Sequence, residues 1–133
     1  MHDPATNGAS RLRVLVVDAD ERVRESLAGL LSIGDRLVVV GAAGDPGHAL
    51  ELVASTQPDV VVLDPRLPEV DRGRALIRRL RKASPGICVI VLSWSDTLDD
   101  GYLRCEADRF IRKTFRPSEL VEAIISTRAL IAH

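Results

Sequence analysis

The amino-acid sequence predicts an α/β domain with a doubly wound, five-stranded parallel sheet and five helices. Its 133 residues suffice for one compact domain and are too few for two. Short apolar runs alternate along the chain with stretches of helical periodicity. These runs are continuous and do not alternate with polar residues, which is typical of parallel strands buried on both faces.

The expected strands are five short runs dominated by valine, leucine and isoleucine. They span residues 14–17, 37–40, 60–63, 88–92 and 110–111. Strict alternation of strands with helices indicates right-handed crossovers between parallel strands, so all strands end at the same edge of the sheet. Ligands of such folds bind at this carboxyl edge.

The expected helices have apolar residues three or four positions apart, which places these residues on one face. They span residues 21–31, 46–55, 74–83, 96–105 and 117–131. The second opens with Pro46, a favoured residue in a first turn, whereas the fourth contains Gly101 and has the least regular spacing. The third carries a basic set that indicates a solvated face, with docking of an acidic partner as the alternative: Arg78, Arg79, Arg81 and Lys82.

Charge and composition argue against several classes of function. The net charge of −1 offers no excess of basic charge for binding nucleic acid. No apolar run reaches the roughly 18 residues that span a membrane, and the polar first ten residues do not resemble a signal peptide. We therefore expect residues 1–10 to be a disordered tail, residues 11–133 to form the domain, and the protein to be cytoplasmic without membrane insertion.

Four polar residues follow strands at the predicted carboxyl edge. Asp18, Asp64 and Ser93 end the first, third and fourth strands, and the fifth runs into Lys113. Two carboxylates suit a hard cation such as Mg²⁺. An aspartate can also accept a phosphoryl group as an acyl phosphate, while a hydroxyl and an ammonium bind the phosphoryl oxygens. The combination predicts a site of phosphoryl transfer.

Each of these four residues also has a simpler structural interpretation when it is taken alone. Asp18 would serve as the N-cap of the first helix, and Asp64 would cap the loop after its strand. Ser93 would be a turn residue, and Lys113 would be a solvated surface charge. Their joint placement at one edge favours the site.

The stretch PDVVVLDPRLPEVDRG, residues 58–73, resembles the phosphoacceptor segment of response-regulator receiver domains in bacterial two-component signalling. In that family an aspartate ends the third strand, a proline follows four residues later, and an acidic residue comes near the next helix. Asp64, Pro68 and Asp71 take these places. The resemblance covers about residues 12–131, and it implies a flavodoxin-like fold of receiver type with Asp64 as the phosphoacceptor.

Two further stretches carry the resemblance. VIVLSW, residues 89–94, is similar to the family's fourth-strand motif, with Ser93 as its hydroxyl. ADRFIRKTF, residues 107–115, is similar to the fifth-strand motif, with Lys113 as its lysine and Phe110 as its switch aromatic. The resemblance implies that Ser93 and Lys113 bind phosphoryl oxygens, and that Ser93 and Phe110 report phosphorylation to the signalling face.

The resemblance also implies a Mg²⁺ site formed by Asp18, Asp64 and the backbone carbonyl of Arg66. The family usually has a second acidic ligand directly after the first, and this chain has Ala19 there. Asp20 comes one residue later, and adjacent side chains leaving a strand point in different directions. We therefore expect Mg²⁺ to bind weakly.

Three other departures from the family pattern affect the same edge. Trp94 replaces a small residue and is a candidate lid over the pocket. Thr114 replaces a proline that follows a cis bond, and since a cis bond before threonine costs roughly 2.5–4 kcal/mol, we expect a trans bond and a changed aim for Lys113. Arg72 stands where the family often has glycine, and Gly73 follows it.

The preferred interpretation is a stand-alone receiver that is phosphorylated on Asp64 by a histidine kinase or a phosphotransfer protein. It would signal by binding an unknown protein partner, with a homodimer as one option. It would not act as an enzyme beyond self-phosphorylation and self-dephosphorylation. The alternative is a degenerate receiver that acts as a constitutive interaction module or as an accessory subunit of a larger assembly.

A haloacid-dehalogenase-like phosphatase is the third hypothesis. VVDADE, residues 16–21, also matches a strand followed by DxD, a motif in which the first aspartate, here Asp18, is the nucleophile. Arg22 stands where that motif has threonine or valine. Its late acidic pair at a strand end is also missing, because Asp99 and Asp100 fall in an expected helix.

Overall fold

In the computed structural model, five parallel strands form a single sheet. They are β1 (Leu12–Val17), β2 (Leu37–Ala43), β3 (Val60–Leu63), β4 (Cys88–Ser93) and β5 (Arg109–Arg112). The order across the sheet is β2–β1–β3–β4–β5, so the chain moves outward in both directions from β1. The structure describes residues 11–67, 70–94, 106–113 and 116–131. This topology confirms the predicted doubly wound α/β class.

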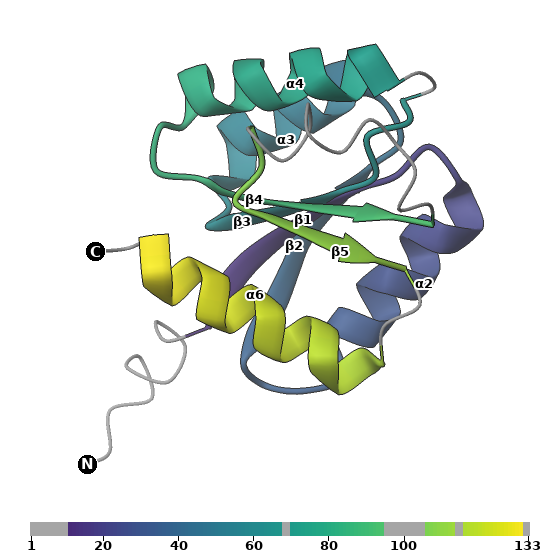
Figure 1. Cartoon of the computed structure of the whole chain (residues 1–133), viewed down its shortest axis with the longest axis vertical. Coiled ribbons are helices and arrows are strands. Elements are labelled where there is room, and N and C mark those ends of the chain that lie inside the picture. The colour runs from purple at the N-terminus through teal and green to yellow at the C-terminus, as the bar shows by residue number, and fades with distance from the viewer. Residues whose placement is uncertain (1–10, 68–69, 95–105, 114–115, 132–133) are drawn as a thin grey trace.

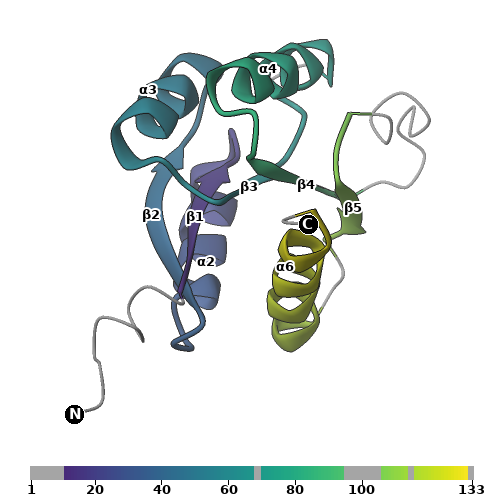
Figure 2. The same ribbon diagram turned by 90° about the vertical axis from the view of Figure 1, so that its left-hand side faces the viewer.

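Helices cover both faces of this sheet (Figures 1 and 2). The described residues contain α2 (Glu21–Leu31), α3 (Pro46–Thr56), α4 (Val70–Ala83) and α6 (Pro117–Ile131). In both views α3 and α4 lie on one face of the sheet, and α2 and α6 lie on the other. The expected helix 96–105 lies outside the described residues.

The hydrophobic core consists of one layer on each face of the sheet. Successive side chains of a strand point to opposite faces, so neighbouring residues of β1 divide between the layers. Leu15 and Val17 join the layer under α3 and α4, while Val14 and Val16 join the layer under α2 and α6. All four are fully buried, as the continuous apolar pattern predicts.

Cys88, the first residue of β4, belongs to the layer under α2 and α6. Its burial raises the pKa of the thiol to about 12, so this side chain is neutral at pH 7 and packs as a small apolar group.

Some element boundaries differ from the predicted ones. β2 continues to Ala43 because it pairs with β1 as far as Val17, and its last residues are small and lack a β-branched signal. α4 begins at Val70, four residues before the expected start at Arg74. The segment before Arg74 contains Gly73 and has the composition of a loop, but its backbone is helical.

The basic side of α4 is not simply solvated, which corrects part of the prediction. Arg81 donates to the carboxylate of Asp108 at 3.1 Å and to the backbone carbonyl of Glu106 at 2.7 Å. Arg74 and Arg78 both donate to Oε1 of Glu106, each through Nε at 3.0 Å. These acids precede β5 and lie 25 or more positions along the chain from their partners, so helical spacing alone did not reveal them.

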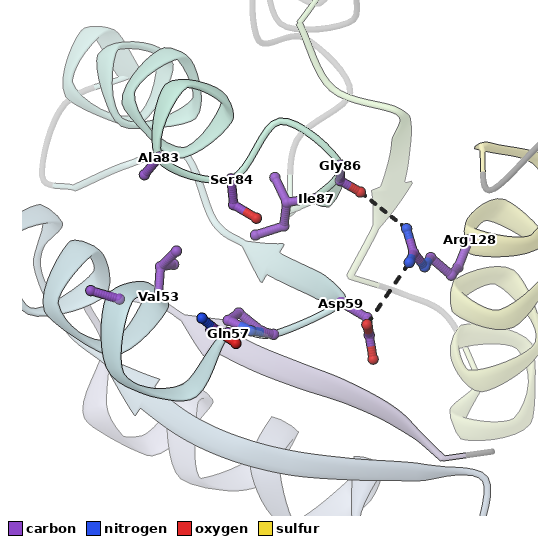
Figure 3. Close-up of a pocket in the computed structure, with 10 residues that line it drawn as sticks. Val53, Gln57, Asp59, Ala83, Ser84, Gly86, Ile87 and Arg128 are labelled. Carbon is purple, nitrogen blue, oxygen red and sulfur yellow. Dashed lines mark hydrogen bonds and ion pairs between the residues drawn. The ribbon is translucent and has the colours of Figure 1, made fainter. Parts of the chain in front are cut away.

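The opposite, amino edge of the sheet is held by Arg128 of α6 (Figure 3). Its guanidinium donates to the backbone carbonyl of Gly86 at 3.0 Å and lies 3.8 Å from the carboxylate of Asp59. A cavity of about 420 Å³ lies beside this pair, with Val53 and Ile87 among its apolar walls. This edge contains the strand starts, so it is remote from the predicted polar site.

We expect Arg81→Ala to lower the free energy of unfolding by about 1–3 kcal/mol, because the backbone carbonyls of Glu106 and Ile87 lose a donor and Asp108 loses its ion-pair partner. Arg79→Ala is the matched control on the same helix, and since Arg79 is exposed we expect a change within about 0.5 kcal/mol. Urea unfolding followed by circular dichroism measures both. Equal losses in the two variants would show that the contacts of Arg81 do not stabilise the fold.

Candidate phosphoryl-transfer site

Two aspartates are held at the carboxyl edge by backbone hydrogen bonds that extend the sheet by one residue. Asp18 directly follows β1, and its N–H donates to the carbonyl of Ala43 at 3.0 Å. Asp64 directly follows β3, and its N–H donates to the carbonyl of Val17 at 2.9 Å. Each aspartate is therefore fixed by the neighbouring strand.

Lys113 joins these two aspartates. Its backbone N–H donates to the carbonyl of Ser93 at 2.8 Å, which places the residue just beyond β5. Its Nζ donates to Oδ2 of Asp18 at 2.7 Å and to Oδ2 of Asp64 at 2.6 Å. The side chains of Lys113, Asp18 and Asp64 are only 4%, 4% and 12% exposed. Two aspartates that are 46 positions apart in sequence thus share the buried ammonium of a lysine 49 positions further along the chain.

The second oxygen of each aspartate accepts a hydrogen bond from a nearby backbone amide. Oδ1 of Asp18 accepts from the N–H of Asp20, and Oδ1 of Asp64 accepts from the N–H of Arg66, each at 2.9 Å. These contacts fix the orientation of both carboxylates. A carboxylate oxygen has two lone pairs, so each oxygen can still accept another donor or bind a cation.

The buried group carries a net negative charge. In this salt-bridged arrangement the formal charges are −2 from the two carboxylates and +1 from the lysine. In a buried position such a charge is costly unless cations or hydrogen-bond donors balance it. The arrangement therefore attracts a further cation.

Asp20 caps α2. Its Oδ1 accepts from the N–H of Arg22 at 2.9 Å and from that of Val23 at 3.3 Å. The simpler interpretation of Asp18 as the N-cap is therefore wrong. The position of Asp20 immediately before Glu21, the first helical residue, is a sequence signal that could have identified the cap.

Ser93 and Phe110 lie on the two strands next to Lys113. Ser93 is the last residue of β4 and is 1% exposed. Phe110 lies in β5 opposite Val91 and packs, half-buried, against the core layer under α3 and α4. Both predicted switch residues thus belong to the edge half of the sheet that carries the lysine.

The indole of Trp94 lies beside the ammonium of Lys113. Its ring centroid is 5.7 Å from Nζ, within the range of a cation–π contact. Trp94 is nevertheless 61% exposed, so it does not bury itself over the pocket. Trp94 and Lys113 also line a cavity of about 300 Å³ whose other walls are α2 residues, Arg22, Val23, Ser26, Leu27 and Leu30.

A model of the response regulator receiver domain family matches residues 14–125. The chain belongs to this family. Receiver domains accept phosphoryl groups from histidine kinases and bind Mg²⁺ at the site of phosphorylation. The match replaces the haloacid-dehalogenase-like hypothesis, because it covers residues of all five strands and assigns them to a receiver.

The curated relatives that contain this domain are longer than this chain. The receiver is 42% identical over 92 residues to protein-glutamate methylesterase/protein-glutamine glutaminase 5 of Anaeromyxobacter dehalogenans, covering 69% of this chain and 25% of the relative. It is 38% identical over 112 residues to response regulator MprA of Mycolicibacterium vanbaalenii, covering 83% and 47%. The chain thus spans a quarter to about half the length of these relatives.

Solved receiver domains have the same fold. The signal receiver domain of the putative response regulator NarL from Mycobacterium tuberculosis superposes with a TM-score of 0.80 at 30% identity, over 90% of this chain and 98% of that one. The response regulator domain of CheB from Thermotoga maritima gives 0.76 at 26% identity, over 90% and 97%. Among the described residues, no helix has the length and apolar character needed to cross a membrane.

The oxygen atoms at this edge of the receiver are suitable ligands for Mg²⁺, although they are few. Asp18 and Asp64 provide two adjacent carboxylates, and Arg66 follows Asp64 on the same loop with a backbone carbonyl. Ala19 is exposed and offers only a methyl group, while Asp20 is committed to α2. Within the described part of the chain, no group of three or more histidine, cysteine or acidic side chains surrounds a common point. Mg²⁺ commonly keeps several waters and binds through one or two carboxylates, so this set is chemically suitable.

Arg24 supports the receiver site, and sequence reasoning missed it. Its NH1 donates to the backbone carbonyl of Asp18 at 2.9 Å. Gly44 lies against the same guanidinium, since a Cβ there would be 2.5 Å from NH1. Arg24 thus ties α2 to the loop that carries Asp18. Nothing in the sequence distinguishes this arginine from the many others.

Several predicted features fall outside the described residues. These are Pro68, the side chain of Asp71, and Thr114 with the conformation of its bond to Lys113. The side chain of Lys113 itself is described, and it is aimed at both aspartates.

Removal of the α2 cap should destabilise the receiver without changing its acidic site. We expect Asp20→Ala to lower the free energy of unfolding by about 1 kcal/mol, because the amides of Arg22 and Val23 lose their acceptor. Asp20→Ser keeps a capping oxygen and should stay within about 0.5 kcal/mol of wild type. Thermal and urea unfolding measure both. A similar loss in the serine variant would mean that the charge of Asp20, and not its cap, stabilises the fold.

Proposed function

We propose that this receiver accepts a phosphoryl group on Asp64 from a histidine kinase or a phosphotransfer protein, and signals through altered protein binding. The observation that supports this most strongly is the buried ammonium of Lys113 between the carboxylates of Asp64 and Asp18. A structural ion pair needs one carboxylate, whereas this arrangement holds a nucleophile, a second carboxylate and a cation together at the ligand-binding edge of the sheet.

In the proposed reaction, a carboxylate oxygen of Asp64 attacks the phosphorus of a phosphohistidine. An O–P bond forms, the P–N bond breaks, and the released imidazole keeps the electron pair and takes up a proton. The product is an acyl phosphate on Asp64. Bound Mg²⁺ supplies neutralisation of phosphoryl charge, and Asp18, Asp64 and the carbonyl of Arg66 would hold it.

Residues of this chain would then stabilise the product. The ammonium of Lys113 exchanges its contact with Oδ2 of Asp64 for one with a phosphoryl oxygen, and the hydroxyl of Ser93 donates to another. Asp18 keeps Lys113 within reach, because it binds the same Nζ at 2.7 Å. The N–H of Arg66 keeps the acyl group oriented through its contact with Asp64.

The same exchange would carry the signal. Ser93 lies on β4 and Phe110 on β5, and these two strands pair with each other. Lys113 directly follows β5, and its backbone N–H donates to the carbonyl of Ser93. A shift of these residues changes the face formed by β5 and α6 and thereby favours one binding state of the domain. The unknown output partner would recognise that face.

The organisation of the whole protein remains a prediction. It includes the stand-alone form, the cytoplasmic location, the absence of nucleic-acid binding and the option of a homodimer. A further prediction is that catalysis is limited to self-phosphorylation and self-dephosphorylation. The methylesterase relative carries its receiver in a chain about four times as long as the matched part.

A degenerate receiver is the second candidate, and Ala19 favours it. Without an acidic side chain there, Asp18 and Asp64 must bind Mg²⁺ while they also bind Lys113. If the cation does not bind, phosphoryl transfer stops and the domain acts as a constant interaction module. Phosphorylation by a small-molecule donor and titration with Mg²⁺ separate these functions.

Incubation with Mg²⁺ and acetyl phosphate should add one phosphoryl group to the wild-type protein, as measured by intact mass. The variant Asp64→Asn should gain none, because its amide is not a nucleophile. Phosphoramidate serves as a second donor, because it carries a P–N bond as phosphohistidine does. No adduct with either donor at saturating Mg²⁺ would contradict the phosphoacceptor proposal and favour the degenerate module. An adduct that persists in Asp64→Asn would place the acceptor elsewhere.

Ala19→Asp should increase the affinity for Mg²⁺ about tenfold, or ~1.4 kcal/mol, because it adds an anionic ligand beside Asp18. Trp94 is the only tryptophan of the chain, and its position beside Lys113 makes its fluorescence a suitable reporter during Mg²⁺ titration. Asp20→Ser is the matched control: it removes a charge next to Asp18 but retains the cap, so we expect an unchanged affinity. Equal affinities of Ala19→Asp and wild type would show that Ala19 does not limit metal binding.

A further inference from the structure

Gly73 in α4 lies against the backbone of the residue that follows Asp64. A Cβ at Gly73 would be 2.0 Å from the carbonyl oxygen of Pro65, 2.5 Å from its Cα and 2.6 Å from its carbonyl carbon. These separations are far shorter than van der Waals contact. The obstructing atoms are backbone, so they cannot rotate aside as the end of a flexible side chain can.

Other described glycines do not have this restriction. A Cβ at Gly29 in α2, or at Gly86 before β4, would have no atom within 4 Å. A Cβ at Gly44 would meet only the guanidinium of Arg24, which is the end of a flexible side chain. Among the glycines of the described residues, Gly73 is the one whose Cβ would collide with backbone.

The loop against which Gly73 packs is fixed on its other sides. Pro65 is buried, and Leu67 is 1% exposed in the same core layer as Leu76 and Ile77 of α4. The loop therefore cannot move outward without uncovering Leu67. A methyl group at position 73 must displace either α4 or residues 64–66.

Displacement of this loop changes the proposed site directly. The N–H of Arg66 orients Oδ1 of Asp64 at 2.9 Å, while Lys113 holds Oδ2 at 2.6 Å. Pro65 links these two residues, so a shift of its carbonyl alters the first contact while the second resists. Geometry within about 1 Å matters for the rate of a transfer reaction.

We propose that Gly73 is a positioning residue, whose lack of a side chain lets α4 approach Pro65 closely enough to hold the Asp64 carboxylate in its reactive orientation. The proposal rests on the proposed function of Asp64 as phosphoacceptor. Gly73 is the fourth residue of α4 and lies in the part of the helix that has the composition of a loop.

The test compares Gly73→Ala with two controls. Gly29→Ala adds the same methyl group to a helix where it meets nothing. Val53→Ala removes buried methyl groups at the opposite edge of the sheet, so it lowers stability without touching the site (Figure 3). For each variant we would measure the unfolding midpoint, the initial rate of phosphorylation by acetyl phosphate below that midpoint, and the ¹H–¹⁵N cross-peak of the Arg66 amide.

We expect Gly73→Ala to lower the phosphorylation rate at least tenfold and to shift the Arg66 cross-peak. Gly29→Ala should stay within twofold of the wild-type rate. Val53→Ala should lose stability but keep the rate and the cross-peak, which separates positioning from a loss of stability. A Gly73→Ala protein with the wild-type rate and an unchanged Arg66 cross-peak would overturn the proposal.

A second variant keeps the test decisive if Gly73→Ala does not fold. Adding Leu67→Ala removes the apolar anchor of the loop and lets the loop move away from the new methyl group. The double variant should then fold and phosphorylate at least tenfold more slowly than Leu67→Ala alone; equal rates would overturn the proposal.

Failure of this proposal is distinguishable from failure of the proposed function. A wild-type protein that gains no phosphoryl group, with a shifted Arg66 cross-peak in Gly73→Ala, would reject Asp64 as phosphoacceptor and keep the backbone coupling. A phosphorylated wild type with an unshifted cross-peak and an undiminished rate in the variant would reject the role of Gly73 alone.

Discussion

The contact on which the site depends is the buried ammonium of Lys113 between the carboxylates of Asp18 and Asp64. Each of these charges would be costly in the interior without the others, and removal of one partner from a buried ion pair commonly costs about 3–5 kcal/mol. The three residues follow three different strands, so the contact also fixes the relative positions of β1, β3 and β5 at their carboxyl ends. The sheet brings the charges together, and the attraction of Lys113 for both carboxylates then stabilises the ends of the strands that hold them.

The overall fold and the composition of this edge follow from the sequence. Continuous apolar runs alternating with helical stretches are sufficient to predict a doubly wound sheet, and the topological rule then predicts that Asp18, Asp64, Ser93 and Lys113 lie near one another. Their proximity needs no knowledge of helix boundaries. The rule gives no information on which donor and acceptor atoms pair. The position of Lys113 between both carboxylates is therefore seen only in the structure.

Contacts between distant side chains could not be predicted in this way. Arg81 has the helical spacing of a solvated residue, and only the path of the chain before β5 brings Asp108 to it. The same holds for Gly73, whose role depends on the distance to Pro65 and not on any local pattern. The cap at Asp20 is different, because its signal is local, but a simpler assignment to Asp18 competed with it.

The arginines of α4 have a consequence for the evolution of the domain. Glu106 is held by Arg74 and Arg78, and Ser93 is held in β4, so the chain between these two residues starts and ends at fixed points. Lengthening a connection between fixed ends costs little, because the entropy of closing a loop grows only with the logarithm of its length. A change in the number of residues between Ser93 and Glu106 should therefore have little effect on the sheet. Selection can then vary this length while the contacts that hold Ser93 and Glu106 are inherited unchanged.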